Sequence, residues 1–132
     1  MATAFDSVKW VWMNGEMVPF KEAKIHVLTH ALHYGSAWFE GIRCYATRRG
    51  PQFFRLEDHV DRLLTSARIY AMAVPYDRQQ LIEACHQVVA QNGLQAAYVR
   101  PLAYRGYGRL GLDPADTPVD VIIAAVEWGH YH

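Results

Sequence analysis

The sequence predicts an α+β fold in which a mainly antiparallel sheet packs against two helices. Strand-like segments stand towards both ends of the chain, and two helical patterns lie next to each other between them. Strands and helices that occur in separate runs, rather than in strict alternation, are typical of this class. The chain has 132 residues. We therefore expect one domain, which buries roughly two-thirds of the surface that the unfolded chain exposes.

The first strands are expected to form a hairpin. Trp10–Met13 and Glu16–Val18 flank Asn14-Gly15, and these two turn residues tolerate the positive φ angles of a type I′ turn. Lys24–Leu28 alternates over a short distance and predicts a further short strand.

The stretch His30–Tyr45 is unusually rich in histidine, aromatic and glycine residues. Its first half has helical spacing, Gly35 interrupts it, and Trp38–Tyr45 alternates like a strand. One face of that strand would carry Phe39, Gly41, Arg43 and Tyr45. A polar and aromatic face is unusual for a core strand, and a glycine within it lets a ligand or another backbone come close. The sequence therefore predicts a binding site on this face.

The middle of the chain predicts a second hairpin and the two helices. Thr47–Gly50 is a polar loop, and Pro51–Leu56 is apolar enough to pair back. The first helix begins at Glu57 or Asp58 and runs to about Ala71, with an apolar stripe of Val60, Leu63, Leu64, Ala67 and Tyr70.

The second helix has clear signals at both ends. Asp77 and Gln80 have the spacing of a capping box, and Asn92-Gly93 followed by Leu94 predicts a Schellman stop. Its apolar stripe consists of Leu81, Ile82, Cys85, Val88 and Val89.

Two more strands are expected at Ala97–Tyr104 and Val119–Trp128, with a loop between them at Gly106–Pro118. The loop begins with G-x-G-x-x-G, which matches the dinucleotide-binding motif in its letters. That motif needs a helix after it to hold the pyrophosphate, and two following prolines exclude a helix here. We interpret the segment as a loop.

Composition limits the classes of partner. Thirteen basic and thirteen acidic side chains leave no net charge, which argues against nucleic acid and against an acidic membrane surface. Apolar residues make up 52% and aromatic residues 13%, and this surplus indicates surface that another domain, a subunit or a ligand covers. Cys44 and Cys85 are expected to be buried, reduced thiols. Because Met1–Lys9 lacks a signal pattern, we expect a soluble, cytoplasmic protein.

Three histidines stand close together at His26, His30 and His33. They could approach one another, but no further cysteine, histidine or acidic residue completes the spacing of a metal site. Histidines hydrogen-bonded around a turn are the favoured interpretation, and we expect no metal.

Two arginines have two interpretations each. Arg62 lies on the flank of the first helix's apolar stripe, where its guanidinium could bind a phosphate. An ion pair with Asp58 one turn away is the alternative, and position alone favours that pair. Arg100 lies two residues from Tyr98 on a strand, so it is either an interface residue or a carboxylate anchor, and spacing does not separate these.

Four longer motifs stand in order along the chain. They are H-A-L-H-Y-G-x-x-x-F-E-G-I-R-C-Y at 30–45, H-x-x-R-L-x-x-S-A at 59–67, A-Y-x-R-P-L at 97–102 and D-V-I-I-A-A-x-x-W-G-x-Y at 120–131. Together they resemble branched-chain amino-acid aminotransferases, which are fold-type IV enzymes that use pyridoxal phosphate. D-amino-acid aminotransferases and aminodeoxychorismate lyases share that fold, but the forms F-E-G-I-R and Y-V-R-P resemble the branched-chain group.

The resemblance implies a role for each matching residue. Arg62 would bind the cofactor phosphate. Substrate would be bound by Tyr34, Phe39, Gly41, Arg43, Tyr98, Arg100, Leu112, Trp128 and Tyr131. Among these, Tyr98 would lie near the α-carboxylate, and Arg100 would meet the distal carboxylate of glutamate together with Tyr34 and Tyr131. Tyr34 and Leu112 would reach the site of a neighbouring subunit, so the resemblance also implies a homo-oligomer.

The resemblance further implies an enzyme that transfers the amino group of leucine, isoleucine or valine to 2-oxoglutarate. Transamination needs an amine that carries the cofactor. The family's lysine lies in a second domain, and the only lysines here are Lys9, Lys21 and Lys24, outside its context. We therefore expect residues 1–132 to be the N-terminal small domain, inactive by itself. A non-catalytic binding or assembly module with the same fold is the alternative.

Overall fold

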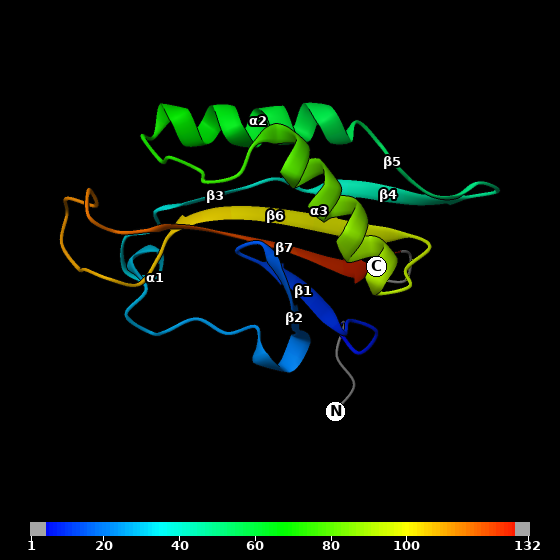
Figure 1. Cartoon of the computed structure of the whole chain (residues 1–132), viewed down its shortest axis with the longest axis horizontal. Helices are drawn as coiled ribbons and strands as arrows, with labels where there is room; N and C mark the ends of the chain where they lie inside the picture. The colour runs from blue at the N-terminus through cyan, green and yellow to red at the C-terminus, as the bar shows by residue number, and fades with distance from the viewer. Residues whose placement is uncertain (1–4, 129–132) are drawn as a thin grey trace.

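A computed structural model describes residues 5–128 and shows a sheet with helices on one face (Figure 1). The strands are β1 (Trp10–Met13), β2 (Glu16–Pro19), β3 (Ala37–Phe39), β4 (Ile42–Thr47), β5 (Gly50–Phe53), β6 (Ala97–Arg105) and β7 (Val119–Glu127). The helices are α1 (His30–Tyr34), α2 (Leu56–Ile69), α3 (Arg78–Gln91) and the 3₁₀ turn η1 (Phe20–Glu22).

Within the described residues, all seven strands belong to one sheet, and every pairing is antiparallel. The strand order is β2-β1-β7-β6-β4-β5, and β3 also pairs with β6. The two long helices α2 and α3 cover the same side of this sheet (Figure 1). The predicted α+β class is therefore confirmed, and the structure adds the short helix α1 and the turn η1.

The first hairpin agrees with its prediction. Asn14 and Gly15 have φ angles of 49° and 93°, as a type I′ turn requires. The further strand predicted at Lys24–Leu28 is wrong, because this segment is a loop. Its polar groups are satisfied locally: the Leu28 N–H donates to His26 Nδ1, and the Val27 carbonyl bonds His33 Nε2 at 2.8 Å.

The strand predicted over Trp38–Tyr45 is divided into β3 and β4 by Glu40-Gly41. The register against β6 is the same on both sides of the break, with Phe39 opposite Leu102 and Ile42 opposite Val99. Paired residues of an antiparallel ladder normally exchange two N–H···O bonds. Pro101 accepts from the Glu40 N–H at 3.0 Å but has no N–H to return. A proline on the partner strand therefore explains the break.

The two long helices begin and end close to their predicted positions. The capping box of α3 is present, with Asp77 and Gln80 each accepting from the other's backbone N–H at 2.8 Å. The Schellman stop is confirmed by bonds from the Leu94 N–H to the Val89 carbonyl and from the Gly93 N–H to the Ala90 carbonyl. Helix α2 ends one residue before Tyr70, whose side chain is exposed rather than part of the buried stripe.

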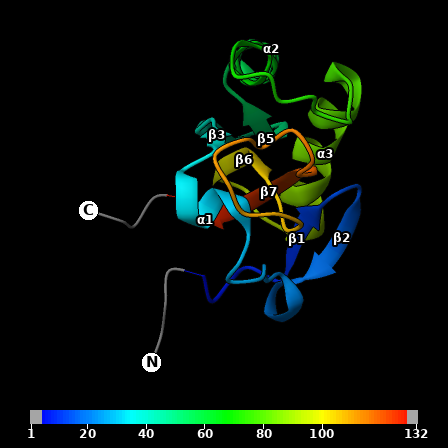
Figure 2. The same ribbon diagram turned by 90° about the vertical axis from the view of Figure 1, so that its left-hand side faces the viewer.

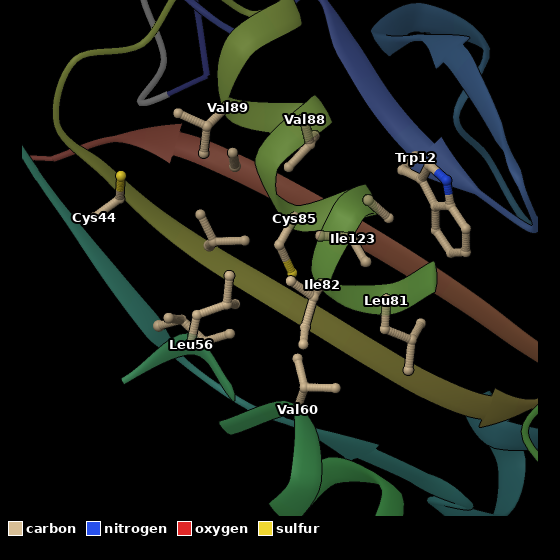
Figure 3. Close-up of a cluster of buried hydrophobic side chains, with 14 of the residues drawn as sticks. Trp12, Cys44, Leu56, Val60, Leu81, Ile82, Cys85, Val88, Val89 and Ile123 are labelled. Carbon is tan, nitrogen blue, oxygen red and sulfur yellow. The ribbon is translucent and has the colours of Figure 1, made fainter. Parts of the chain in front are cut away.

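The apolar core lies between the sheet and the helices α2 and α3 (Figure 3). Cys85 and Val88 on α3 lie over the central strands, and Val60 on α2 closes the core beside them. Cys44 and Cys85 are fully buried free thiols, as predicted. Because side chains alternate along a strand, this arrangement leaves the opposite face of the sheet uncovered by α2 and α3.

The segment between β6 and β7 is a loop, as expected, so its glycine pattern is not a dinucleotide-binding turn. It lies beside α1 at one end of the molecule (Figure 2). None of the helices within residues 5–128 has the length and apolar character needed to cross a membrane.

Candidate functional site

The face of the sheet opposite α2 and α3 carries the predicted polar and aromatic side chains. Ile42 and Cys44 of β4 are buried towards the helices, whereas the alternate residues Arg43 and Tyr45 are exposed. In register with Arg43 lies Tyr98 of β6. The predicted alternation is thus confirmed, and it places one side of the strand in the core and the other on an open face.

Gly41 makes room for an aromatic ring on this open face. A Cβ atom at Gly41 would lie 2.4 Å from Tyr98 Oη, which is closer than atoms can approach. The Tyr98 ring in turn stacks on Trp128, with 5.8 Å between ring centroids and an interplanar angle of 26°. The glycine therefore admits a neighbouring side chain of the site, so its predicted role in close approach takes this specific form.

Two arginines on the open face rest on aromatic rings. Arg100 Cζ lies 4.2 Å from the centroid of Phe39, and its Nη2 donates to Tyr98 Oη at 2.9 Å. Arg43 Cζ lies 5.0 Å from the centroid of Trp128. Cations are attracted to ring faces at such distances. Within residues 5–128 neither guanidinium is paired with a carboxylate, so both are available to an anionic ligand.

A second group of predicted residues lies where α1 meets the β6–β7 loop (Figure 2). Buried His30 lies 2.7 Å from Ser36 Oγ through Nδ1 and 2.9 Å from the Gly111 carbonyl through Nε2. The Gly111 N–H donates to Tyr34 Oη at 3.1 Å. Leu112 follows directly and is 89% exposed. These contacts fix Tyr34 and the loop to each other.

The same contacts decide the interpretation of the histidines. His26, His30 and His33 each bond backbone or hydroxyl groups around the turn. No group of three or more potential metal ligands occurs in the part of the chain that the structure describes.

Arg62 on α2 has a partner that the sequence did not indicate. Its Nε lies 2.9 and 3.0 Å from the two carboxylate oxygens of Glu40, and its Nη2 lies 2.6 Å from Oε1. The alternative pair with Asp58 is wrong, because Asp58 pairs with Arg55 at 2.8 Å. Glu40 stands 22 residues before Arg62, so helical spacing could not reveal it.

The carboxylate of Glu40 is held by two groups. The residue is only 7% exposed, and His59 Nδ1 lies 2.9 Å from Oε1. Burial by itself raises the pKa of Glu40, but the hydrogen bonds and charges of Arg62 and His59 outweigh it and leave this pKa below its usual value. The same carboxylate raises the pKa of the Arg62 guanidinium. Both groups therefore stay charged around neutral pH.

Arg62 also borders an open cavity of about 420 Å³, which it lines with Phe54, Arg55, Asp58 and His59. Its side chain is 67% exposed despite the contact with Glu40. A guanidinium presents a planar fork of donors that matches phosphate oxygens. The donor set at this cavity therefore fits a phosphate group.

Comparison with known proteins identifies the family. Residues 37–132 match the family described as amino-transferase class IV. The chain belongs to the class IV aminotransferases. It is 49% identical to the branched-chain-amino-acid aminotransferase of Escherichia coli (strain K12) over 123 residues, which cover 92% of this chain and 40% of that protein. The enzyme of the same name from Pseudomonas aeruginosa is 46% identical over 121 residues, covering 92% and 39%.

Solved structures agree with this assignment. The crystal structure of the Escherichia coli branched-chain amino acid aminotransferase superimposes with a TM-score of 0.89 at 48% identity, covering 92% of this chain and 41% of that one. The T.th. enzyme complexed with N-(5'-phosphopyridoxyl)-L-glutamate superimposes with a TM-score of 0.90 at 48% identity, covering 95% and 42%. The chain thus spans about 40% of the length of such class IV aminotransferases.

The structure brings together most of the predicted site residues of this class IV aminotransferase chain. Those on the open sheet face are Phe39, Gly41, Arg43, Tyr98, Arg100 and Trp128. Tyr34 and Leu112 lie apart from them at the α1 end, Arg62 lies on α2, and Tyr131 is outside the described residues. Sequence reasoning missed Glu40 and His59 as partners of Arg62. Both stood within the recognised motifs, but nothing in their spacing indicated a shared contact.

Proposed function

We propose that residues 1–132 form the N-terminal small domain of a branched-chain amino-acid aminotransferase. The complete enzyme transfers the amino group of leucine, isoleucine or valine to 2-oxoglutarate by means of pyridoxal phosphate. The single observation that carries this proposal is the open sheet face, where arginines without carboxylate partners in residues 5–128 rest on aromatic rings. Such a surface suits a site that takes an apolar side chain in one half-reaction and a second carboxylate in the other.

In this proposal Arg100 binds the distal carboxylate of glutamate, with Tyr34 and Tyr131 beside it. When a branched-chain substrate is bound, the guanidinium stays over Phe39 and hydrogen-bonded to Tyr98. A cation that loses all partners on burial is costly, and these two contacts reduce that cost.

The remaining residues of the open face shape the pocket. Phe39, Gly41 and Trp128 line the space for the apolar side chain, and Tyr98 lies near the α-carboxylate. Arg43 supports the glutamate carboxylate from the adjacent strand. The ring stacking between Tyr98 and Trp128, which Gly41 permits, keeps these groups in one plane of contact.

Arg62 binds the phosphate of the cofactor, which supplies the electron sink that transamination needs. The lysine that carries the cofactor belongs to a second domain. Lys9, Lys21 and Lys24 are exposed, and none of them lines the cavity beside Arg62. The isolated chain would therefore bind and orient ligands without catalysing the reaction.

We also propose that the enzyme is a cytoplasmic homo-oligomer in which Tyr34 and Leu112 contribute to the site of the neighbouring subunit. Both residues are accessible for such a contact, with exposed fractions of 43% and 89%. The hydrogen bond from the Gly111 N–H to Tyr34 Oη would present them together.

The proposal is tested by expressing the complete enzyme that contains this chain. Supplied with pyridoxal phosphate and 2-oxoglutarate, it should form glutamate from L-leucine, L-isoleucine and L-valine, and a variant lacking the lysine of the second domain is the control. Activity confined to D-amino acids, or lyase activity on aminodeoxychorismate, would assign the chain to another branch of the family.

A further inference from the structure

The contact between Arg62 and Glu40 divides the guanidinium into two parts. An arginine side chain carries five N–H donors in a fixed plane. Glu40 occupies the side that contains Nε, through bonds of 2.9 and 3.0 Å from Nε and one of 2.6 Å from Nη2. Within residues 5–128, no group accepts a hydrogen bond from Nη1. The terminal edge of the guanidinium, formed by Nη1 and the second N–H of Nη2, is thus left for another anion.

Glu40 is itself held in place from two directions. Its backbone N–H donates to the Pro101 carbonyl at 3.0 Å, which fixes it at the break between β3 and β4. Its carboxylate accepts from His59 as well as Arg62, with Nδ1 2.9 Å from Oε1. The side chain is 8% exposed, whereas that of Arg62 is 67% exposed. The buried carboxylate is therefore the fixed partner and the exposed arginine the group that it orients.

The position of Glu40 along the chain connects the two parts of the site. It alternates with Phe39 and Gly41, which face the open side of the sheet, so its own side chain turns towards α2. One short stretch thus contributes both to the ring-lined face and to the cavity that Arg62 borders.

We propose that Glu40, assisted by His59, is a positioning residue that holds Arg62 with its terminal edge towards the cavity for the phosphate of the cofactor. This inference rests on the proposed function, in which Arg62 binds that phosphate. A bidentate contact on one edge fixes the guanidinium plane, so less side-chain freedom is lost when the phosphate binds.

The sign of the effect of removing the Glu40 charge separates positioning from mere proximity. A carboxylate next to an anion site repels the anion, so removing its charge would by itself strengthen phosphate binding. Loss of the fixed orientation would instead weaken binding. Glu40→Gln tests which of the two effects is larger, because glutamine keeps the size of the side chain.

The experiment titrates the complete apoenzyme with pyridoxal phosphate and, separately, with pyridoxal, which lacks the phosphate. Glu40→Gln should raise the dissociation constant for pyridoxal phosphate by about tenfold, the effect of one lost charged contact. Its dissociation constant for pyridoxal should change by less than about twofold, since only the phosphate site is altered. Glu57→Gln is the matched control: this exposed glutamate on α2 pairs with Arg78, and its loss should change neither value.

Two variants keep the outcomes distinct. Arg62→Ala should lose the preference for the phosphorylated ligand; if it does not, Arg62 is not the phosphate site and the proposed function fails at that point. If Arg62→Ala loses the preference but Glu40→Gln keeps or increases it, only the positioning role is overturned. Should Glu40→Gln fail to fold, His59→Gln decides: it removes one of the two groups that hold the carboxylate, and an unchanged affinity for pyridoxal phosphate would contradict the proposal.

Discussion

Arg100 is the residue whose surroundings bear most directly on substrate choice. It lies between the ring of Phe39 and the hydroxyl of Tyr98, at 4.2 Å from the ring centroid and 2.9 Å from the oxygen. These partners are uncharged, so a carboxylate that entered the site would compete with them favourably. The geometry thus supports the carboxylate-anchor interpretation of this arginine over a purely structural one.

Replacing Arg100 by methionine in the complete enzyme should impair the glutamate half-reaction far more than the leucine half-reaction. Loss of one charged hydrogen-bonded contact costs about 1.5–3 kcal/mol, or roughly 10- to 100-fold in rate. Single-turnover kinetics of each half-reaction measure the effect, and Arg48→Met in the exposed β4–β5 turn is the control. Equal losses in both half-reactions would show that Arg100 holds the shared α-carboxylate or the fold.

Cys85 makes stability depend on alkaline pH. Burial raises the pKa of its thiol from 9.0 to about 12. Below pH 9 the thiol is neutral in both the folded and the unfolded chain, so its contribution to stability is fully present. Above pH 9 the unfolded chain loses a proton that the folded chain keeps, and stability falls until about pH 12.

Cys85→Val should remove part of this alkaline loss. Urea unfolding at pH 7 and pH 10 should show that the wild-type chain loses about 1 kcal/mol more than the variant over this interval. The comparison stops at pH 10 because burial and the nearby Asp120 also raise the pKa of Tyr104, from 10.0 to about 12. An identical pH dependence in both chains would mean that the thiol is accessible to solvent in the folded state.

At the scale of secondary structure elements, end signals fix α3 more firmly than α2. Helix α3 has a complete capping box and a Schellman stop. Helix α2 begins after Arg55, which has a left-handed φ of 56° and gives no side-chain cap. Its position depends instead on the buried residues Leu56, Val60 and Leu63. This difference explains why the first residue of α2 was harder to predict than that of α3.

Asp77→Ala should therefore destabilise the chain by about 1 kcal/mol, since an N-cap of this kind contributes roughly 0.5–2 kcal/mol. Urea unfolding at neutral pH should show a lower midpoint with an unchanged denaturant slope. Glu83→Ala is the control on the exposed surface of the same helix and should stay within about 0.5 kcal/mol of the wild type. A loss no larger than that of the control would show that the capping box contributes nothing measurable.

At the scale of the whole molecule, the sheet separates two environments. One face is closed by α2 and α3 over an apolar core, and the other presents arginines and aromatic rings (Figure 1). The chain covers about 40% of the length of its relatives. In the proposed enzyme, the open face is completed by the second domain and the neighbouring subunit.

The purified 132-residue chain should therefore form no glutamate from leucine and 2-oxoglutarate when pyridoxal phosphate is added. None of its three lysines lines the cavity beside Arg62, and the complete enzyme is the positive control. The measurement is glutamate release compared with the rate of free cofactor. Turnover well above that rate, abolished when borohydride traps a lysine of the chain, would contradict the proposal.

The sequence by itself determined features that depend on neighbouring residues. The turn at Asn14-Gly15, the capping box at Asp77 and the alternation around Arg43 each follow from backbone preferences or side-chain periodicity within a few residues. The histidines around the first helix were also interpreted correctly, because no metal-ligand spacing accompanied them. Motif resemblance then indicated the family, which residues 37–132 confirm.

Only the tertiary structure decided which distant groups meet. Pro101 breaks the strand predicted over Trp38–Tyr45 because it lies opposite Glu40 on another strand and cannot donate a hydrogen bond. Glu40, rather than Asp58, pairs with Arg62, because the fold brings residues 22 positions apart into contact while Arg55 takes Asp58. Local spacing carries no information about such contacts, since they depend on how whole elements pack.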